Sequence, residues 1–187
     1  MRSKSTHPRF PPLETERLRL RDFRADDAAF VLRLWGDPVV TEYMIVDPQI
    51  TTLAQAALNV RAFRRRRRSF HRWVLELKET GEAIGTCGFT EWRKRYRRAE
   101  IGFDLVPSHW GKGLMGEALA AVLRFGFEEL ELHRIWAMTH PENARSIRAL
   151  ERAGFKREGH LRDYYIDKGR FVDRLIYALL EGERAEG

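Results

Sequence analysis

The sequence has a single cysteine, Cys87, among its 187 residues. One cysteine can form neither a disulfide within the chain nor a metal site of several cysteines, and it is consistent with a reducing compartment. The six histidines include no pair at i, i+4, so we expect no zinc site. The chain also lacks a run of about 18 apolar residues and an apolar segment behind its basic N-terminus, so we expect neither a membrane span nor a secretory signal. These absences predict a cytoplasmic protein with no metal and no membrane partner.

The length and the hydrophobic content suit one domain. Hydrophobic residues make up 43% of the sequence, which is enough for a full core, whereas 187 residues are few for two independent domains. We expect a single domain over residues 13–180, with tails at 1–12 and 181–187.

The formal net charge of +7 is concentrated in two short basic runs. Residues 61–72 hold seven arginines, residues 93–98 hold five basic residues, and neither run contains an acid. The rest of the chain has 22 basic residues, the 34 of the whole chain less these 12, against 27 acidic ones. Such local patches attract a polyanion such as RNA, the ribosome or a phosphorylated cofactor. A solvated helix end and a solvated hairpin tip explain the same two runs.

The spacing of apolar residues predicts the order β-α-α-β-β-β-α-β-α-β-β. Helices are expected at 26–35, from Thr51, over 117–130 and over 143–152, each with a capping residue or glycine at an end. The last strand is expected at 171–180, after a turn at 167–170. Alternation of this kind indicates a mixed α/β sheet with helices on both faces.

The stretch WGKGLMG, residues 110–116, places three glycines where a helix is about to begin. Helix N-termini expose unpaired N–H groups and a partial positive charge, and glycines let the oxygens of an anion approach that backbone. The stretch is neither a Walker A loop nor a GxGxxG fingerprint, so it predicts a phosphate cradle of another kind. A tight turn between strand and helix is the alternative explanation.

The surroundings of this stretch resemble a known family. WGKGLMGEAL after EIGFDLVP, followed by PENARSIRALERAGF, resembles the GNAT superfamily of acetyl-CoA-dependent N-acetyltransferases. Within it, LETERLRLRDF resembles the opening strand of the branch that acetylates N-terminal alanines of ribosomal proteins. The resemblance covers residues 13–180 and implies a central, mostly antiparallel sheet that splays at two parallel strands, with helices on both faces. It also implies acetyl-CoA as co-substrate.

The resemblance implies where acetyl-CoA binds. The pantetheine arm is expected to pair with the end of one splayed strand, at Phe103, Leu105 and Val106. Asn143 matches an asparagine that contacts the cofactor in the family, and it is also expected to cap its helix. The pyrophosphate is expected on the backbone of six consecutive residues: Gly111, Lys112, Gly113, Leu114, Met115 and Gly116.

The glycine stretch departs from the family pattern at two positions. Trp110 stands where Gln or Arg is usual, and Met115 stands where a small residue is usual. Both changes keep the backbone N–H groups, but Met115 could crowd the phosphates.

Acetyl transfer to an amine needs a base for the ammonium, a donor for the oxyanion and a proton for the departing thiolate. Glu100 matches a position where the family often has the carboxylate that removes the amine proton, and Glu91 is the alternative base. An alternative explanation is equally good: Glu100 lies exposed at a strand edge and balances the positive charges of Arg97 and Arg98. The oxyanion donor is expected to be a backbone N–H near Gly102 or Phe103.

The usual acid of the family, a tyrosine, is replaced here by Leu150. In the resembling branch a serine three residues after the asparagine is thought to protonate the thiolate, and Ser146 stands there. A serine in the first turn of a helix is also explained by capping.

The acceptor is expected between residues 24–72 and the loop before the last strand, with four candidate wall aromatics, Trp35, Tyr43, Tyr164 and Tyr165. The basic residues 64–68 disfavour a polycation and suit a protein that binds RNA. We predict direct attack, in a ternary complex, by the N-terminal amine of a ribosomal protein. The alternatives are a small-molecule amine acetyltransferase, acting on an amino-acid analogue or an aminoglycoside, and a non-catalytic module that binds CoA or RNA. Monomer and homodimer both remain open.

Overall fold

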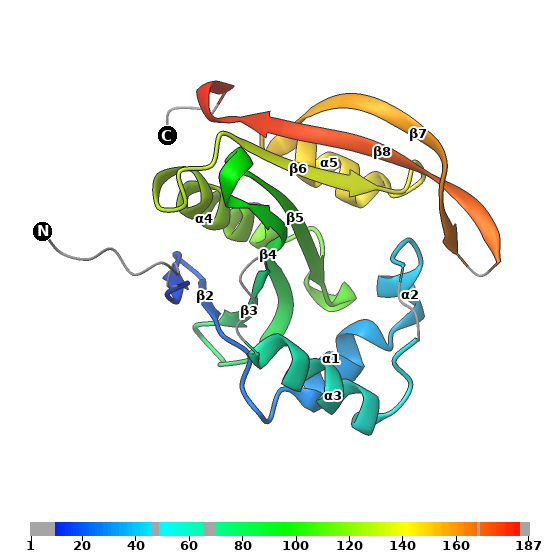
Figure 1. The fold of residues 1–187 in the computed structure, drawn as a ribbon. Coiled ribbons are helices and arrows are strands. Elements are labelled where there is room, and N and C mark those ends of the chain that lie inside the picture. The colour runs from blue at the N-terminus through cyan, green and yellow to red at the C-terminus, as the bar shows by residue number, and fades with distance from the viewer. Residues whose placement is uncertain (1–9, 46–48, 66–69, 168, 184–187) are drawn as a thin grey trace, which may run out of the picture.

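The computed structural model describes residues 10–45, 49–65, 70–167 and 169–183. Eight strands form one sheet in the order β1-β2-β3-β4-β5-β6-β8-β7 (Figure 1). The strands are β1 (Leu13–Glu14), β2 (Leu18–Arg21), β3 (His71–Leu77), β4 (Ala83–Arg93), β5 (Arg98–Leu105), β6 (Arg134–Thr139), β7 (Lys156–Asp167) and β8 (Arg170–Leu180). The helices are α1 (Ala28–Trp35), α2 (Pro38–Thr41), α3 (Leu53–Arg64), α4 (Leu114–Glu128) and α5 (Ala144–Arg152).

The observed sheet confirms the expected fold class. Neighbouring strands are antiparallel except for β5 and β6, which run parallel. The sequence patterns did not predict β1 or α2, which have two and four residues and are too short to show a period.

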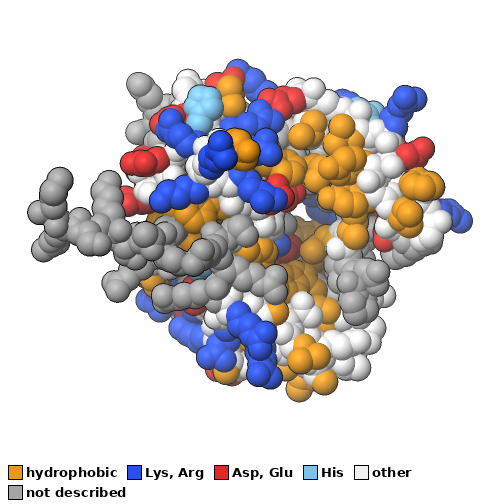
Figure 2. Space-filling view, viewed as in Figure 1, with side chains coloured by type: hydrophobic (Ala, Val, Ile, Leu, Met, Phe, Trp, Pro, Cys, Tyr) orange, Lys and Arg blue, Asp and Glu red, His pale blue; other side chains and the backbone are white. Residues whose placement is uncertain are grey.

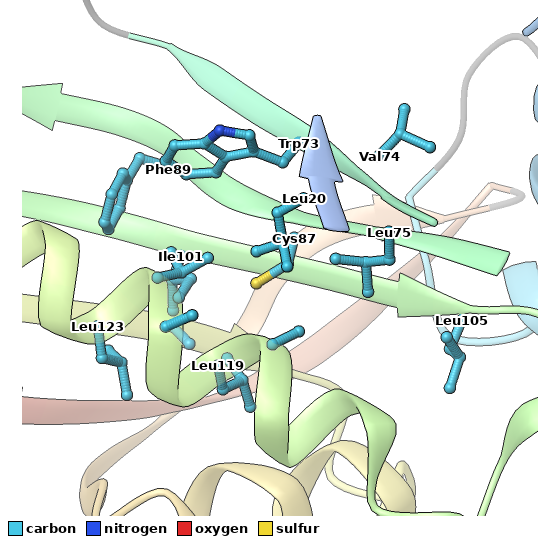
Figure 3. Packing of buried hydrophobic residues seen from close by; sticks show 14 of the residues in the cluster. Leu20, Trp73, Val74, Leu75, Cys87, Phe89, Ile101, Leu105, Leu119 and Leu123 are labelled. Atoms are coloured by element: carbon cyan, nitrogen blue, oxygen red, sulfur yellow. The ribbon is translucent and has the colours of Figure 1, made fainter. Parts of the chain in front are cut away.

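Helices cover both faces of the sheet (Figure 1). On one face α4 packs on β4, and the side chains between them, including Cys87, Phe89, Ile101 and Leu119, are buried (Figure 3). The other face is covered by α1 and α3, and the indole of Trp35 in α1 donates to Asp104 of β5 at 3.1 Å. Because side chains alternate along a strand, Ile101, Phe103 and Leu105 share the α4 face, and the even-numbered residues of β5 share the α1 face.

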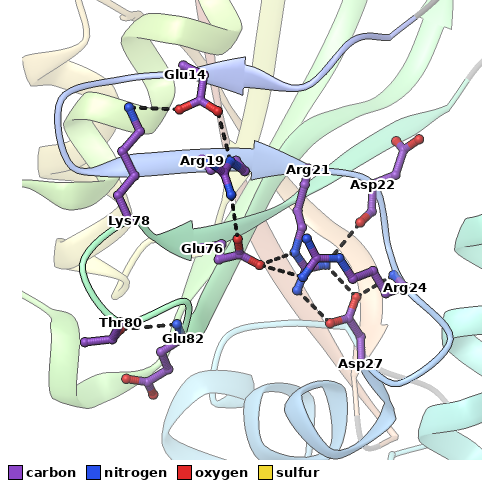
Figure 4. A network of polar contacts seen from close by, with 10 residues as sticks. All are labelled: Glu14, Arg19, Arg21, Asp22, Arg24, Asp27, Glu76, Lys78, Thr80 and Glu82. Carbon is purple, nitrogen blue, oxygen red and sulfur yellow. Dashed lines mark hydrogen bonds and ion pairs between the residues drawn. The ribbon is translucent and has the colours of Figure 1, made fainter.

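A buried ionic network fixes α1 to the sheet (Figure 4). The guanidinium of Arg21 in β2 donates to both carboxylate oxygens of Asp27 at 2.8 Å and to Glu76 of β3 at 2.5 Å. The helix expected at 26–35 begins at Ala28, after Asp27. The Asp27 side chain makes no capping bond to the helix because it accepts from Arg21 and from the N–H of Arg24 instead. The start of α1 is therefore held by β2.

The parallel pair separates part of the way along its length. β5 and β6 pair at Arg98↔Arg134, Ala99↔Ile135 and Glu100↔Trp136. Beyond Glu100 no pairing joins them, although β5 continues to Leu105 and β6 to Thr139. This splay, as the family resemblance implied, leaves one backbone edge of β5 without a strand partner.

Candidate active site

The glycine stretch lies where β5 gives way to α4. Gly113 is the N-cap of α4, and Gly111 and Gly113 have φ of 75° and 77°, which favour glycine. A Cβ at Gly111 or Gly116 would meet no atom within 4 Å, so the space above the first turn is open. Leu114 is buried and Met115 packs against the core, so these two side chains are directed at the core.

Trp110 holds the end of β5 beside this stretch. Its indole N–H donates to the carbonyl of Leu105 at 2.7 Å, and the guanidinium of Arg145 lies 4.0 Å from its ring centre. The N–H of Val106 donates to Ile84 at 2.8 Å. One group at each of Leu105 and Val106 is therefore already bonded within the protein, which leaves the backbone of Phe103 as the freer part of this edge.

Arg17 and Glu117 brace the glycine stretch, a feature that the sequence analysis missed. Glu117, in the first turn of α4, accepts from the N–H of Arg17 and from its Nε, both at 2.7 Å. Nη1 of Arg17 donates to the carbonyl of Lys112 at 3.0 Å. Burial tends to raise the pKa of Glu117, but the hydrogen bonds from Thr15 and Arg17 outweigh it and lower that pKa. No local pattern connects residues 100 positions apart, so the sequence alone gave no signal for this brace.

These features fit a ligand with a phosphate group and a hydrogen-bonding arm. The N-terminus of α4 offers a positive end with open space beside Gly111 and Gly116 and with the guanidinium of Arg17 beside Gly113. At the end of β6, the hydroxyl of Thr139 is buried and has no hydrogen-bond partner among the described residues. A buried hydroxyl of this kind is costly unless a ligand or water satisfies it.

The start of α5 carries Asn143 and Ser146. Oδ1 of Asn143 accepts from the N–H of Ser146 at 3.0 Å, which confirms the predicted cap. Within the described residues the hydroxyl of Ser146 makes no hydrogen bond, so it is available to a ligand. Leu150 is fully buried in the core.

Glu100 lies at the closed end of the splay. It accepts from the hydroxyl of Thr90 at 2.8 Å. Burial raises the pKa of Glu100, Glu91 adds to the shift, and Thr90 and Arg72 oppose it. A carboxylate with a raised pKa inside a cleft is a typical general base.

The neighbours of Glu100 argue against a surface ion pair. Arg97 donates to the carbonyl of Glu131 at 2.7 Å and pairs with Glu181 at 3.2 Å, and the guanidinium of Arg98 lies 5.5 Å from the ring of Tyr96. Neither arginine pairs with Glu100 in the described part of the chain.

The alternative base is less suitable. Glu91 is partly exposed and forms an ion pair with Arg93 at 2.8 Å. That contact holds the carboxylate at the hairpin surface, so Glu100 is the better placed of the two.

A buried polar cluster continues from Glu100 along the α1 face of β5. Arg72 donates to Asp104 at 2.6 Å and to the hydroxyl of Thr86 at 2.9 Å, and that hydroxyl donates to Asp104 at 2.7 Å. A Cβ on Gly102 would lie 3.3 Å from Nη1 of Arg72, so the guanidinium passes directly over this glycine. Arg72 therefore faces the interior. The prediction that it belongs to a basic patch on the surface is wrong. A glycine inside a strand marks a close approach, and Gly102 was the available signal.

The predicted wall aromatics are divided between core and cleft. Trp35 is buried, and its ring packs against Phe63 with centres 5.2 Å apart. Tyr43 stacks on His140 at 5.0 Å, which brings the segment after α2 to the loop before α5. Tyr164 and Tyr165 lie near the end of the β7–β8 hairpin and are partly exposed.

Tyr165 lies within electrostatic reach of Glu100. Burial raises the pKa of its phenol, Tyr164, Glu100 and Glu91 raise it further, and Arg174 opposes the shift. The molecule is hollowed near the middle of the face shown in Figure 2, and hydrophobic side chains border the hollow. A cleft of this kind suits an acceptor with some apolar surface.

The two basic runs differ in what can be described. Residues 66–69 lie outside the described residues, and Arg61 and Arg64 lie in the last turn of α3. At the tip of the β4–β5 hairpin, Arg93 and Arg97 are paired with acids. Lys94, Arg95 and Arg98 form no ion pair with any described residue, and the guanidinium groups of Arg95 and Arg98 lie near the ring of the exposed Tyr96.

Two features are absent from the part of the chain that the structure describes. No helix there is long and apolar enough to cross a membrane. The same residues contain no group of three or more His, Cys, Asp or Glu side chains that could hold a metal ion.

Comparisons with known proteins agree with this geometry. The model of the family described as "Acetyltransferase (GNAT) domain" matches residues 17–156. The chain is 42% identical to "Uncharacterized N-acetyltransferase p20" of Bacillus licheniformis, over 92% of this chain and 98% of that protein. It is 36% identical to "[Ribosomal protein uS5]-alanine N-acetyltransferase" of Escherichia coli, over 52% of this chain and 51% of that protein. The structure "Mycobacterium smegmatis RimJ in complex with CoA-disulfide" superimposes with a TM-score of 0.81 at 27% identity, over 92% of this chain and 87% of that one.

Proposed function

The chain belongs to the GNAT acetyltransferase family and is an acetyl-CoA-dependent N-acetyltransferase, and on that premise we propose that it acetylates the N-terminal α-amino group of a protein, specifically a ribosomal protein. The observation that carries the proposal is the half-buried Glu100 at the closed end of the splay, where its carboxylate accepts from Thr90 and burial raises its pKa. The relative that acts on ribosomal protein uS5 supports this choice of acceptor. Ribosomal proteins are made in the cytoplasm, so we propose that location as well.

The binding residues follow from the open backbone of the site. Acetyl-CoA, when bound, supplies an activated acetyl group as a thioester. In this proposal the N–H groups from Gly111 to Gly116 hold the pyrophosphate, and Phe103 pairs with the arm of the cofactor. Leu105 and Val106 take a smaller part, because each already has one backbone bond within the protein. Asn143 caps α5 through Oδ1, and in this proposal the rest of its amide forms hydrogen bonds with the cofactor.

Glu100 is the proposed base. Its carboxylate removes one proton from the acceptor ammonium, directly or through a water, and the neutral nitrogen then forms a bond to the acetyl carbon. The carbon–sulfur bond breaks as the nitrogen loses its second proton to solvent. The hydroxyl of Ser146 gives a proton to the departing sulfur and takes one back from solvent. The backbone N–H near Gly102 or Phe103 is the donor for the oxygen that becomes negative.

The charges around the cleft favour a single amine over a polyamine. Two arginines, Arg72 and Arg174, lie on the α1 face of the sheet, and Asp104 is already neutralised by Arg72. A polycation would meet repulsion there, whereas a peptide N-terminus brings one positive charge. The alternative is a small monoamine such as an amino-acid analogue, which fits the same charges.

The basic tip of the β4–β5 hairpin supports an acceptor that is bound to RNA. The guanidinium carbons of Arg95 and Arg98 lie 5.9 and 5.5 Å from the ring centre of Tyr96, which is 63% exposed, and Lys94 precedes Arg95 in the same turn. Basic residues around an exposed aromatic ring suit phosphates and stacked bases. We propose that this tip contacts ribosomal RNA.

The test is thiol release from acetyl-CoA with a panel of amines. Peptides with Ala or Ser at the N-terminus are compared with aminoglycosides, polyamines and free amino acids. Turnover concentrated on the peptides supports the proposal, and turnover concentrated on a small amine contradicts it. Glu100→Gln and Glu91→Gln, measured on the best acceptor, separate the two candidate bases.

A further inference from the structure

Arg174 of β8 is a buried arginine that forms no ion pair with any acidic residue in the described part of the chain. Its exposed fraction is 5%, and its only hydrogen bond with a described residue runs from Nη1 to the carbonyl of Asp173 at 3.0 Å. Arg21, which is equally buried, has the carboxylates of Asp27 and Glu76. A buried charge without a counter-charge is costly, so proteins rarely keep one without a use.

The strand register places Arg174 on the same sheet face as Glu100. Glu100 pairs with Trp136, and Trp136 pairs with Ala178, so these three residues share a face. Arg174 is four residues from Ala178 along β8, and the alternation of side chains returns it to that face. It lies one residue beyond the last pair of β8 with β6, Leu175↔Thr139, at the level where the splay is open.

Tyr165 connects the two positions. Its ring centre lies 5.6 Å from the guanidinium carbon of Arg174, and its phenol lies close enough to Glu100 for that carboxylate to raise the tyrosine's pKa. Burial lowers the pKa of Arg174, while the negative charge of Asp167 and the phenol of Tyr165 oppose that shift. Asp167 forms no ion pair with Arg174, so among the described residues no carboxylate is bonded to the guanidinium.

We infer that Arg174 binds a carboxylate of the acceptor, so that the acceptor is an amine with an acidic group a few bonds away. This inference rests on the proposed function. Two strand spacings and four residues of rise put the Cα atoms of Glu100 and Arg174 on the order of 16 Å apart. The two side chains cover about half of that span, and two or three extended peptide residues cover the rest. The acceptor is therefore a peptide with Asp or Glu within its first three residues.

The experiment compares matched peptides that differ only in charge. Amidated peptides that begin Ala-Glu and Ala-Ala-Glu are measured beside their Gln counterparts, and a free amino dicarboxylate is measured beside its amide. We expect the wild-type protein to prefer the acidic member about tenfold in kcat/KM, mainly through KM, as expected for a hydrogen bond between charged groups. Preference within the peptides identifies a protein acceptor, and preference only within the free amino acids identifies a small one and overturns the peptide assignment.

Variants then assign the preference to one side chain. Arg174→Gln should remove the preference and leave the KM for acetyl-CoA unchanged, and Arg174→Lys should restore part of it. Arg170→Gln, on the same strand but exposed, should change neither value. Thermal unfolding checks that each variant folds, and the wild-type comparison tests the inference without any variant.

The outcomes separate this inference from the proposed function. Peptides that are acetylated without regard to charge, or a preference that survives in Arg174→Gln, overturn the role of Arg174 alone. A rise in the KM for acetyl-CoA in Arg174→Gln overturns it too, because the arginine would then serve the cofactor. Absence of turnover with every amine overturns the proposed function and this inference together.

Discussion

The two faces of the sheet meet at the splay between β5 and β6 and differ in what they offer a ligand. On the α4 face the available groups are backbone N–H groups, placed by glycines and by a helix N-terminus. On the α1 face they are side chains such as Glu100, Arg72 and Arg174, held by partners from several strands. In the proposed site, cofactor binding therefore depends on backbone groups, whereas acceptor choice depends on side chains that can change independently.

The largest expected effect comes from Glu100→Gln. Loss of a general base lowers kcat by about 10²- to 10⁴-fold. Burial raises the pKa of Glu100 in the folded state, so its ionised form is disfavoured above the unfolded pKa. The same variant should therefore unfold at higher urea than wild type at pH 7, and the difference should vanish at a pH below the unfolded pKa.

Thiol release measures the activity and urea denaturation measures the stability, both on the same samples. Lower activity together with lower stability would contradict the assignment, because it would show that Glu100 is a structural residue. An unchanged affinity for acetyl-CoA would show that the loss of activity in Glu100→Gln does not arise from weaker cofactor binding.

Asp104→Asn is expected to have the next largest effect, on stability. Asp104 and Arg72 form a buried pair, and removal of one partner from such a pair costs about 3 to 5 kcal/mol in free energy of unfolding. The control is Glu82→Gln, which breaks an exposed pair with Arg33 and should cost less than about 1 kcal/mol. Equal effects in urea denaturation would mean that the cluster under the acceptor cleft contributes no more than a surface contact.

Gly111→Ala tests the backbone side of the comparison. An L side chain at φ 75° costs about 1 to 2 kcal/mol and alters the cradle, so the Kd for acetyl-CoA should rise about tenfold. Gly169→Ala is the matched control, because it has φ 77° and equally open space at the turn between β7 and β8. Isothermal titration should show weaker binding only at Gly111, and equal loss in both variants would point to general strain.

The smallest effect is expected at the basic hairpin tip. Lys94→Ser with Arg95→Ser should weaken RNA binding and reduce its salt dependence by about two counterions, without changing turnover of a short peptide. Arg157→Ser with Arg162→Ser removes the same charge from β7 and serves as control. Identical salt slopes for the two double variants would show that only net charge matters.

Features that depend on local backbone could be predicted from the sequence. Gly111 and Gly113 were identified because glycine before a helix has few purposes, and Asn143 because caps have a clear residue preference. The parallel pair and its splay followed from the family resemblance. The four-residue helix α2 and the two-residue strand β1 were not predicted, because each is too short to show a repeating pattern of apolar residues.

Features that depend on distant partners could not be predicted. Arg72 belongs by sequence to a run of arginines, and only Asp104, brought beside it by two strand pairings, makes it an interior residue. Arg17 and Glu117 are likewise joined only in the folded chain. Arg174 could not be identified from local sequence, because its burial and its lack of an ion pair with any described residue are visible only in the folded chain.

The pH dependence of kcat/KM for an alanine-terminated peptide tests the central claim most directly. The base must be ionised, and burial raises the pKa of Glu100 above its ordinary value. The account predicts a limb of the profile that rises with pH at an apparent pKa above 4.5 and is lost, with most of the rate, in Glu100→Gln. A variant with the same profile and the same rate as wild type would contradict the account.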